Sequence, residues 1–76
     1  MKELLIFIAK HLVDNPDEVS VTELDNGTSV VLELRVDPSD MGKVIGRQGR
    51  IAKEIRTIVR SAAARQNKKV SVEIIG

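Results

Sequence analysis

The chain has 76 residues, 42% of them hydrophobic and 30% charged, with a formal net charge of +1, so it has the composition of one small globular domain and not of a disordered tail. It contains no cysteine, which excludes a disulfide framework and a thiolate metal site and fits a reducing compartment. The apolar run near the start stops after six residues, too soon for a signal peptide or a membrane span, and we therefore expect a cytoplasmic protein.

The first predicted element is a helix over residues 2–13. It ends before Pro16, because the residue that precedes a proline is pushed out of the helical region. At about 100° per residue the apolar side chains fall into a core stripe and a second group that points elsewhere. The stripe is Leu4, Leu5, Ile8 and Leu12, and the second group is Ile6, Phe7 and Val13.

Two strands follow, over residues 19–23 and 30–36, and both alternate between apolar and polar side chains. The core face of the second strand is predicted to carry Val30, Leu32, Leu34 and Val36. Asp25, Asn26 and Gly27 supply the chemistry of a tight turn, so the two strands are expected to form a hairpin.

A short helix is predicted next, with Asp37 as its N-cap, Pro38 at its first position and an end near Ile45, before Gly46. A longer helix over residues 50–65 has one apolar face, formed by Ile51, Ala52, Ile55, Ile58, Val59, Ala62 and Ala63. After an exit turn at 67–69, residues 70–75 alternate as a closing strand. The order α-β-β-α-α-β predicts an α+β fold with three helices on a three-stranded sheet.

The segment Gly46-Arg47-Gln48-Gly49 joins the two later helices. A glycine costs about 1 kcal/mol within a helix relative to alanine, so two of them indicate a sharp turn or a close approach to the backbone. The following helix begins here with unpaired N–H groups and the positive end of its dipole, which suits a phosphate. The alternative interpretation is an ordinary helix end followed by a turn.

Charge is divided unevenly around this segment. Residues 1–41 carry three Lys/Arg and nine Asp/Glu, whereas residues 42–76 carry nine Lys/Arg and two Asp/Glu. A positive field of this kind is typical of a protein that binds a polyanion, although a solvated helix face would have the same composition.

These residues resemble a KH domain of the type II arrangement, and more closely the small bacterial single-domain RNA-binding proteins of the KhpA type. The resemblance covers residues 1–76 as one domain, and the segments that carry it are 14–17, 40–50 and 67–70. It implies a type II KH fold in a cytoplasmic protein that binds single-stranded RNA as a post-transcriptional regulator or RNA chaperone. It also implies partners, namely a second copy of the chain and a larger KH-containing protein of the Jag type.

The resemblance also implies which residues bind RNA. The loop would clamp the sugar-phosphate backbone of about four nucleotides, and the bases would enter an apolar groove between the first motif helix and the second strand. The backbone contacts would come from Gly46, Arg47, Gln48, Gly49, Arg50, Lys43 and Lys53, and the groove lining from Val44, Ile45 and Ala52. Ala52 is smaller than the residue usual at its position, which would affect base preference more than backbone binding.

Other classes of protein fit the sequence less well. A single histidine, His11, and no cysteine leave an enzyme without a nucleophile or a metal site, so we expect neither catalysis, nor a cofactor, nor a metal. A Rossmann site is excluded because no strand leads into a Gly-x-Gly-x-x-Gly turn, and a Walker loop is excluded because the chain has no Gly-Lys-Ser/Thr. RRM and OB modules stack bases on aromatic rings, and Phe7 is the one aromatic residue of the chain.

One structural alternative stays open at this point: the chain could serve as a dimerisation module for a larger KH-containing protein, with the glycine segment a simple joint. Ile6 and Phe7 lie off the predicted core stripe of the first helix, and Ile58 lies at the edge of the apolar face of the 50–65 helix, so these three residues are candidates for a contact with another chain.

Overall fold

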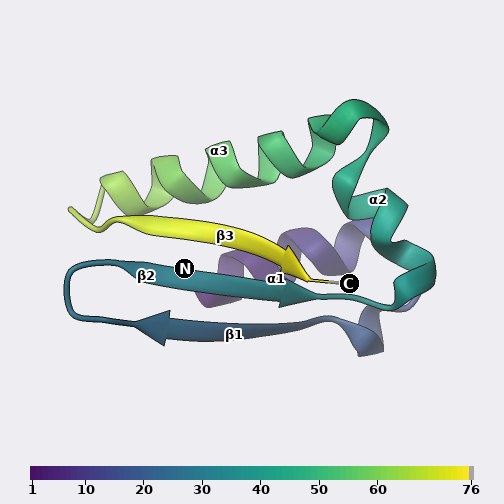
Figure 1. Ribbon diagram of the computed structural model, residues 1–76, viewed down its shortest axis with the longest axis horizontal. Coiled ribbons are helices and arrows are strands. Elements are labelled where there is room, and N and C mark those ends of the chain that lie inside the picture. Colours follow the sequence, from purple (N-terminus) through teal and green to yellow (C-terminus); the bar gives the residue numbers. More distant parts are fainter. Residues whose placement is uncertain (76) are drawn as a thin grey trace.

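A three-stranded sheet with helices over one of its faces makes up the fold, in a computed structural model that describes residues 1–75 (Figure 1). The strands are β1 (Ser20–Asp25), β2 (Val30–Arg35) and β3 (Val70–Ile75), in the order β1-β2-β3. β1 pairs antiparallel with β2, and β3 pairs parallel with β2. The predicted order of elements, the hairpin and the closing strand are confirmed, and β1 begins one residue later than predicted and ends two later.

The hairpin turn owes its shape to local hydrogen bonds. The carboxylate of Asp25 accepts a hydrogen bond from the N–H group of Gly27 at 2.8 Å, and the side-chain oxygen of Asn26 accepts one from the N–H group of Ser29 at 2.8 Å. Gly27 has a φ of 92°, a region that other residues rarely enter. The predicted turn is confirmed.

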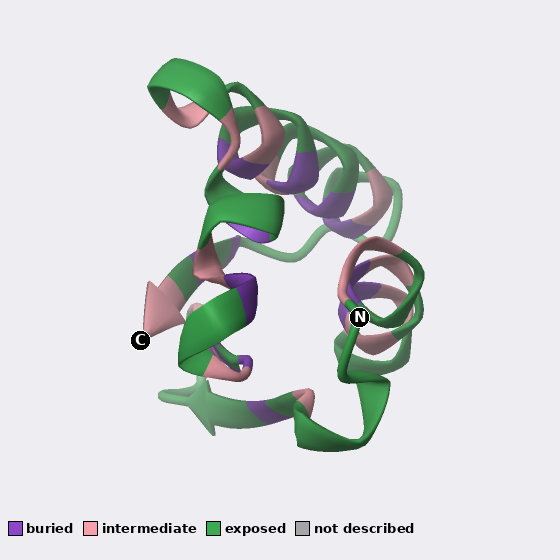
Figure 2. Ribbon diagram, turned by 90° about the vertical axis from the view of Figure 1, so that its right-hand side faces the viewer, coloured by how far each residue is buried: buried purple, intermediate pink, exposed green. Residues whose placement is uncertain are grey.

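The helices are α1 (Lys2–Leu12), α2 (Met41–Ile45) and α3 (Arg50–Ala64). The predicted helix starting at Pro38 begins with a single 3-10 turn, Pro38–Asp40, before α2 continues, and a further 3-10 turn, Pro16–Glu18, was not predicted. Asp37 acts as the expected N-cap, since its carboxylate accepts a hydrogen bond from the N–H group of Ser39 at 2.9 Å. Figure 2 shows α1 and α3 side by side, with their buried residues turned inward.

The core lies between these helices and the sheet. Its largest fully buried apolar side chains are Leu5, Leu32, Leu34, Val44, Ile55 and Val59. On α1 the buried residues are Leu5 and Ala9, and Ile6, Ile8 and Leu12 pack partly against the core. The predicted stripe on α1 was therefore too narrow, because the helix touches both the sheet and α3 and buries a wider face. Ile6 is part of the buried face of α1. Phe7 on α1 and Ile58 on α3 are exposed.

One charged residue is buried within residues 1–75, namely Asp40, at 1% exposure. Its carboxylate accepts hydrogen bonds from the backbone N–H groups of Asp14 at 3.2 Å and Asn15 at 3.0 Å, and from the side-chain amide of Asn15 at 3.2 Å. Lys43 approaches it at 3.4 Å and also pairs with Asp14 at 2.9 Å. Through Asp40 the end of α1 is therefore bound to the start of α2.

The environment of Asp40 lowers its pKa. Burial alone raises the pKa of this carboxyl, but the hydrogen bonds from Asp14, Asn15 and Lys43 together outweigh burial and hold the pKa below the ordinary value of 3.8. A carboxyl whose pKa is lower in the folded state stabilises the fold above its unfolded pKa. That stability is lost as the pH falls through the folded pKa.

We therefore expect Asp40→Asn to lower the melting temperature at pH 7 by several degrees, because an amide nitrogen would face donors where a carboxylate oxygen now accepts. The variant should also lose less stability than the wild type as the pH falls below 3.8. Thermal unfolding followed by circular dichroism from pH 7 to acid measures both effects. Asp17→Asn, at an exposed position, is the control. A melting temperature for Asp40→Asn equal to that of the wild type at pH 7 would contradict this account.

Candidate nucleic-acid interface

The joint between α2 and α3 lies at one end of the molecule, beyond the end of the sheet where β2 and β3 terminate (Figure 1). Gly46 ends α2 with φ 75° and ψ 177°, and its N–H group donates to the carbonyl of Gly42 at 2.9 Å. Arg47–Gly49 then form one 3-10 turn in which Gln48 has a φ of 57° and Gly49 a φ of 75°. The predicted break at Gly46 is confirmed, and the chain enters α3 directly at Arg50.

The two glycines are needed for different reasons. A Cβ atom at Gly46 would lie 2.3 Å from Cγ1 of Ile51, so this position has no room for a side chain and its backbone packs against α3. At Gly49 nothing lies within 4 Å of the place where a Cβ atom would stand, and the requirement is its positive φ alone. The backbone at Gly49 is therefore open to a close approach from outside.

This difference predicts unequal costs for alanine. In Gly46→Ala the new side chain would clash with Ile51, and alanine would have to adopt φ and ψ values that are almost restricted to glycine. We expect this substitution to reduce the free energy of unfolding by about 3 kcal/mol or more. Gly49→Ala carries only the conformational cost, about 1–2 kcal/mol. Urea unfolding of both variants measures the two values. Equal losses would show that the contact with Ile51 does not decide the need for glycine at position 46.

Positive side chains surround the joint. Arg47, Gln48, Arg50 and Lys53 are exposed, and within residues 1–75 no carboxylate lies within ion-pair distance of Arg47, Arg50 or Lys53. No side chain caps the N-terminus of α3. Free donors and uncompensated positive charge are thus brought together at one place, as the sequence predicted for the loop and these three basic residues.

Lys43 has a different environment. Its ammonium group pairs with the carboxylates of Asp14 and Asp40, and the hydrogen bond to Asp14, with the charge of the same carboxylate, raises the pKa of Lys43 above its ordinary value. Two negative charges therefore offset this positive one. The contact of Lys43 with the RNA backbone stays a prediction, and in this structure its ammonium group is paired with two carboxylates from the acidic half of the chain.

The predicted apolar lining is also only partly at the surface. Val44 is fully buried in the core and cannot touch a base in this structure, and Ala52 is 4% exposed. Ile45, one position along from Val44 on α2, is 37% exposed and does face outward. The expectation that Val44 and Ala52 line an open groove was wrong, because Val44 belongs to the buried core and the short helix α2 packs against α3 and α1.

Arg56 was missed by sequence reasoning. Its Nε atom donates a hydrogen bond to the main-chain carbonyl of Val72 in β3 at 3.2 Å, and the side chain is half-buried. Positions 53, 56 and 60 fall within about 60° of arc on a helix, so Lys53, Arg56 and Arg60 lie along one side of α3. That spacing was the signal available in the sequence.

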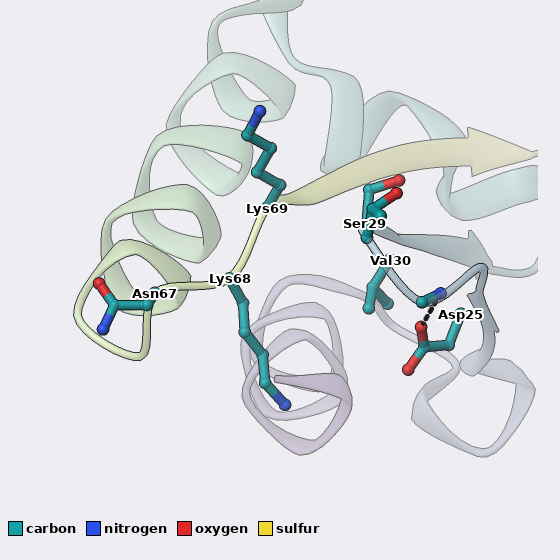
Figure 3. Close-up of a pocket in the computed structure, with 8 residues that line it drawn as sticks. Asp25, Ser29, Val30, Asn67, Lys68 and Lys69 are labelled. Carbon is teal, nitrogen blue, oxygen red and sulfur yellow. Dashed lines mark hydrogen bonds between the residues drawn. The ribbon is translucent and has the colours of Figure 1, made fainter.

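A hollow of about 130 Å³ lies at the opposite end of the molecule, between the hairpin turn and the start of β3 (Figure 3). Asp25, Ser29, Val30, Asn67, Lys68 and Lys69 are among its lining residues. Figure 3 shows the ammonium groups of Lys68 and Lys69 directed away from one another, and the Asp25 carboxylate is bonded to the turn. The hollow therefore presents no converging set of groups for an anion.

Within residues 1–75, no three His, Cys, Asp or Glu side chains gather in a way that could hold a metal ion. None of the helices in this range has the length and apolar character required to span a membrane.

The mixed sheet, the element order and the Gly-x-x-Gly joint define a KH domain of the type II arrangement. A model of the KhpA/KhpB KH domain matches residues 2–74, and the chain belongs to this family. Proteins named RNA-binding protein KhpA from Clostridium acetobutylicum and Clostridium perfringens are each 63% identical over 75 residues, which is 99% of this chain and 100% of theirs. The protein of that name from Aquifex aeolicus is 49% identical, over 99% of this chain and 95% of its own.

The fold also has a counterpart among solved structures. A crystal structure of an Era variant from Aquifex aeolicus, bound to GDP and AlF4-, superposes with a TM-score of 0.66 over 96% of this chain and 28% of that chain, at 21% identity. This likeness supports the type II KH fold.

Proposed function

We propose that the protein binds single-stranded RNA in the cytoplasm, through one KH domain formed by residues 1–76, and acts as a post-transcriptional regulator or RNA chaperone. The observation that carries the proposal is the open backbone at Gly49 among three basic side chains that have no acidic partner in the described residues. The names of the two Clostridium relatives, each 63% identical to this chain, support the same function. Gly76, the last residue of the proposed domain, lies outside the described residues.

The loop would clamp the RNA backbone. A sugar-phosphate strand can lie against Gly49 because no atom of the described residues fills the space beside it. The N–H group of Arg50 donates to the carbonyl of Arg47, and the N–H groups that follow it at the start of α3 have no side-chain cap and can donate to a phosphate. Arg47, Gln48 and Arg50 add donors and charge from exposed positions, and Lys53 lies one turn further along α3. Gly46 serves by holding the turn tight against Ile51.

The strength of this clamp should be modest. Two or three phosphate contacts without aromatic stacking correspond to micromolar affinity, about −8 kcal/mol, and to a strong dependence on salt. Phe7 lies on α1 beside the ring of His11, and the loop itself contains no aromatic residue on which a base could stack. The proposed role is that of a binding protein and not of an enzyme.

The first test replaces Arg47 and Gln48 together with Asp. Two carboxylates would face the phosphates, and Asp tolerates the positive φ of position 48, so we expect a folded protein with at least a hundredfold weaker RNA binding. Circular dichroism and fluorescence anisotropy with a short single-stranded RNA measure the two properties. Lys2→Asp with Gln66→Asp makes the same change in net charge at exposed positions and is the control. Unchanged affinity in a folded loop variant would show that the loop does not contact RNA and only joins the two helices.

A second function, self-association, rests on two exposed apolar side chains. Phe7 on α1 is 62% exposed and Ile58 on α3 is 45% exposed. We propose that these residues contact a second copy of the chain or a larger KH-containing protein of the Jag type. Two loops on one particle would raise the avidity for RNA without a new contact. The family model covers both KhpA and KhpB, which suits a pairing of two related KH domains.

Sedimentation of the wild type at tens of micromolar tests the homodimer. We expect a dimer that Ile58→Lys or Phe7→Lys converts to a monomer, because a lysine in an apolar contact is desolvated without a partner. Ala64→Lys, at an exposed position of the same helix about 120° around it from Ile58, is the control and should leave the dimer intact. A monomeric wild type would refute self-association, and a dimer that tolerates both lysines would place the contact elsewhere.

A further inference from the structure

The residues at the loop offer no obvious means of recognising a base. The loop contacts a backbone that is the same in every RNA, and of the three expected lining residues only Ile45 has a substantial surface. A polar group beside the loop is therefore needed if the protein distinguishes bases. Among Lys53, Arg56 and Arg60, only Arg56 has a side-chain hydrogen bond to another element within residues 1–75.

The geometry around Arg56 has three features that matter. β3 is an edge strand, and α3 runs above it (Figure 1), so the side chain reaches down from the helix to the strand. Position 56 is seven residues after Gly49, which is about 10 Å along the helix axis and so beyond the reach of the phosphate clamped at the loop. Arg56 is half-buried between helix and strand, whereas Lys53 and Arg60 are exposed.

The hydrogen bond to Val72 also determines which nitrogens of Arg56 remain available as donors to a ligand. Nε is engaged by the carbonyl, and within residues 1–75 no hydrogen bond or ion pair occupies the two terminal nitrogens. Those nitrogens form a planar fork whose orientation is fixed by the bond at Nε. A fork of this shape matches two acceptors on one edge of a base, and O6 and N7 of guanine are the pair that arginine binds best.

We propose that Arg56 reads guanine in the bound RNA, with Nε held by the carbonyl of Val72 and the terminal nitrogens donating to O6 and N7 of the base. The proposal rests on the proposed RNA binding at the Gly-x-x-Gly loop. Lys53 and Arg60, on either side of Arg56 and without a fixed partner, contact phosphates and do not distinguish bases.

The test uses three eight-nucleotide RNAs of uridine with two central guanines, two central adenines or two central cytosines, and anisotropy titrations at several salt concentrations. The wild type should bind the guanine RNA about tenfold more tightly than the others. Arg56→Lys keeps the charge and removes the fork, so it should abolish this preference and leave the salt slope unchanged. Lys53→Ala should keep the preference, weaken all RNAs alike and reduce the slope by about 0.7.

A second measurement needs no variant. Guanine RNA made with 7-deazaguanine lacks the N7 acceptor, and its affinity for the wild type should fall to that of the adenine RNA. Equal binding of the guanine and 7-deazaguanine RNAs, a preference for cytosine, or an Arg56→Lys variant weakened on all RNAs with a reduced slope would each overturn the assignment. In all three cases the RNA still binds, so the proposed function survives. If the wild type bound none of the RNAs, the proposed function itself would fail.

Discussion

The orientation of the joint depends on the buried carboxylate of Asp40. A charge removed from water is costly unless its oxygens are fully hydrogen-bonded, and here four donors from three residues meet them. Two of those donors are backbone N–H groups directly after α1, and the carboxylate itself stands directly before α2. The bonds therefore fix where α2 begins relative to α1. Since α2 has only five residues, its start also determines where Gly46 and the loop lie.

The same cluster joins the acidic first half of the chain to its basic second half. The acidic half supplies Asp14 and Asp40, and these two carboxylates pair with Lys43 from the basic half. The remaining basic residues of the joint, Arg47 and Arg50, have no carboxylate within ion-pair distance in the described residues. One lysine thus contributes to the fold, and its neighbours along the chain keep their charge available at the surface. A composition count cannot separate these two uses of a basic residue.

The sequence was informative where the structure is local. The alternation of β2, the turn at Asp25–Gly27 and the break at Gly46 each depend on residues within a few positions of one another, and all were predicted. The roles of Asp40 and Arg56 depend on partners 25 or 26 and 16 positions away, and neither was predicted. Val44 was misplaced for a related reason, because the face that a five-residue helix buries is set by its neighbours and not by a periodicity too short to measure.

The position of Arg56 follows from the same packing that removes Val44 and Ala52 from the surface. α3 lies close enough to the sheet to bury Ile55 and Val59, and this brings the next residue around the helix within reach of the β3 backbone. An arginine there satisfies a main-chain carbonyl with one nitrogen and keeps two others for a ligand, which a lysine could not do with the same geometry. Close packing thus closes the apolar groove and, by the same contact, holds the guanidinium in one orientation. In a chain with a single aromatic residue, the proposed guanidinium would distinguish bases through hydrogen bonds and not through stacking.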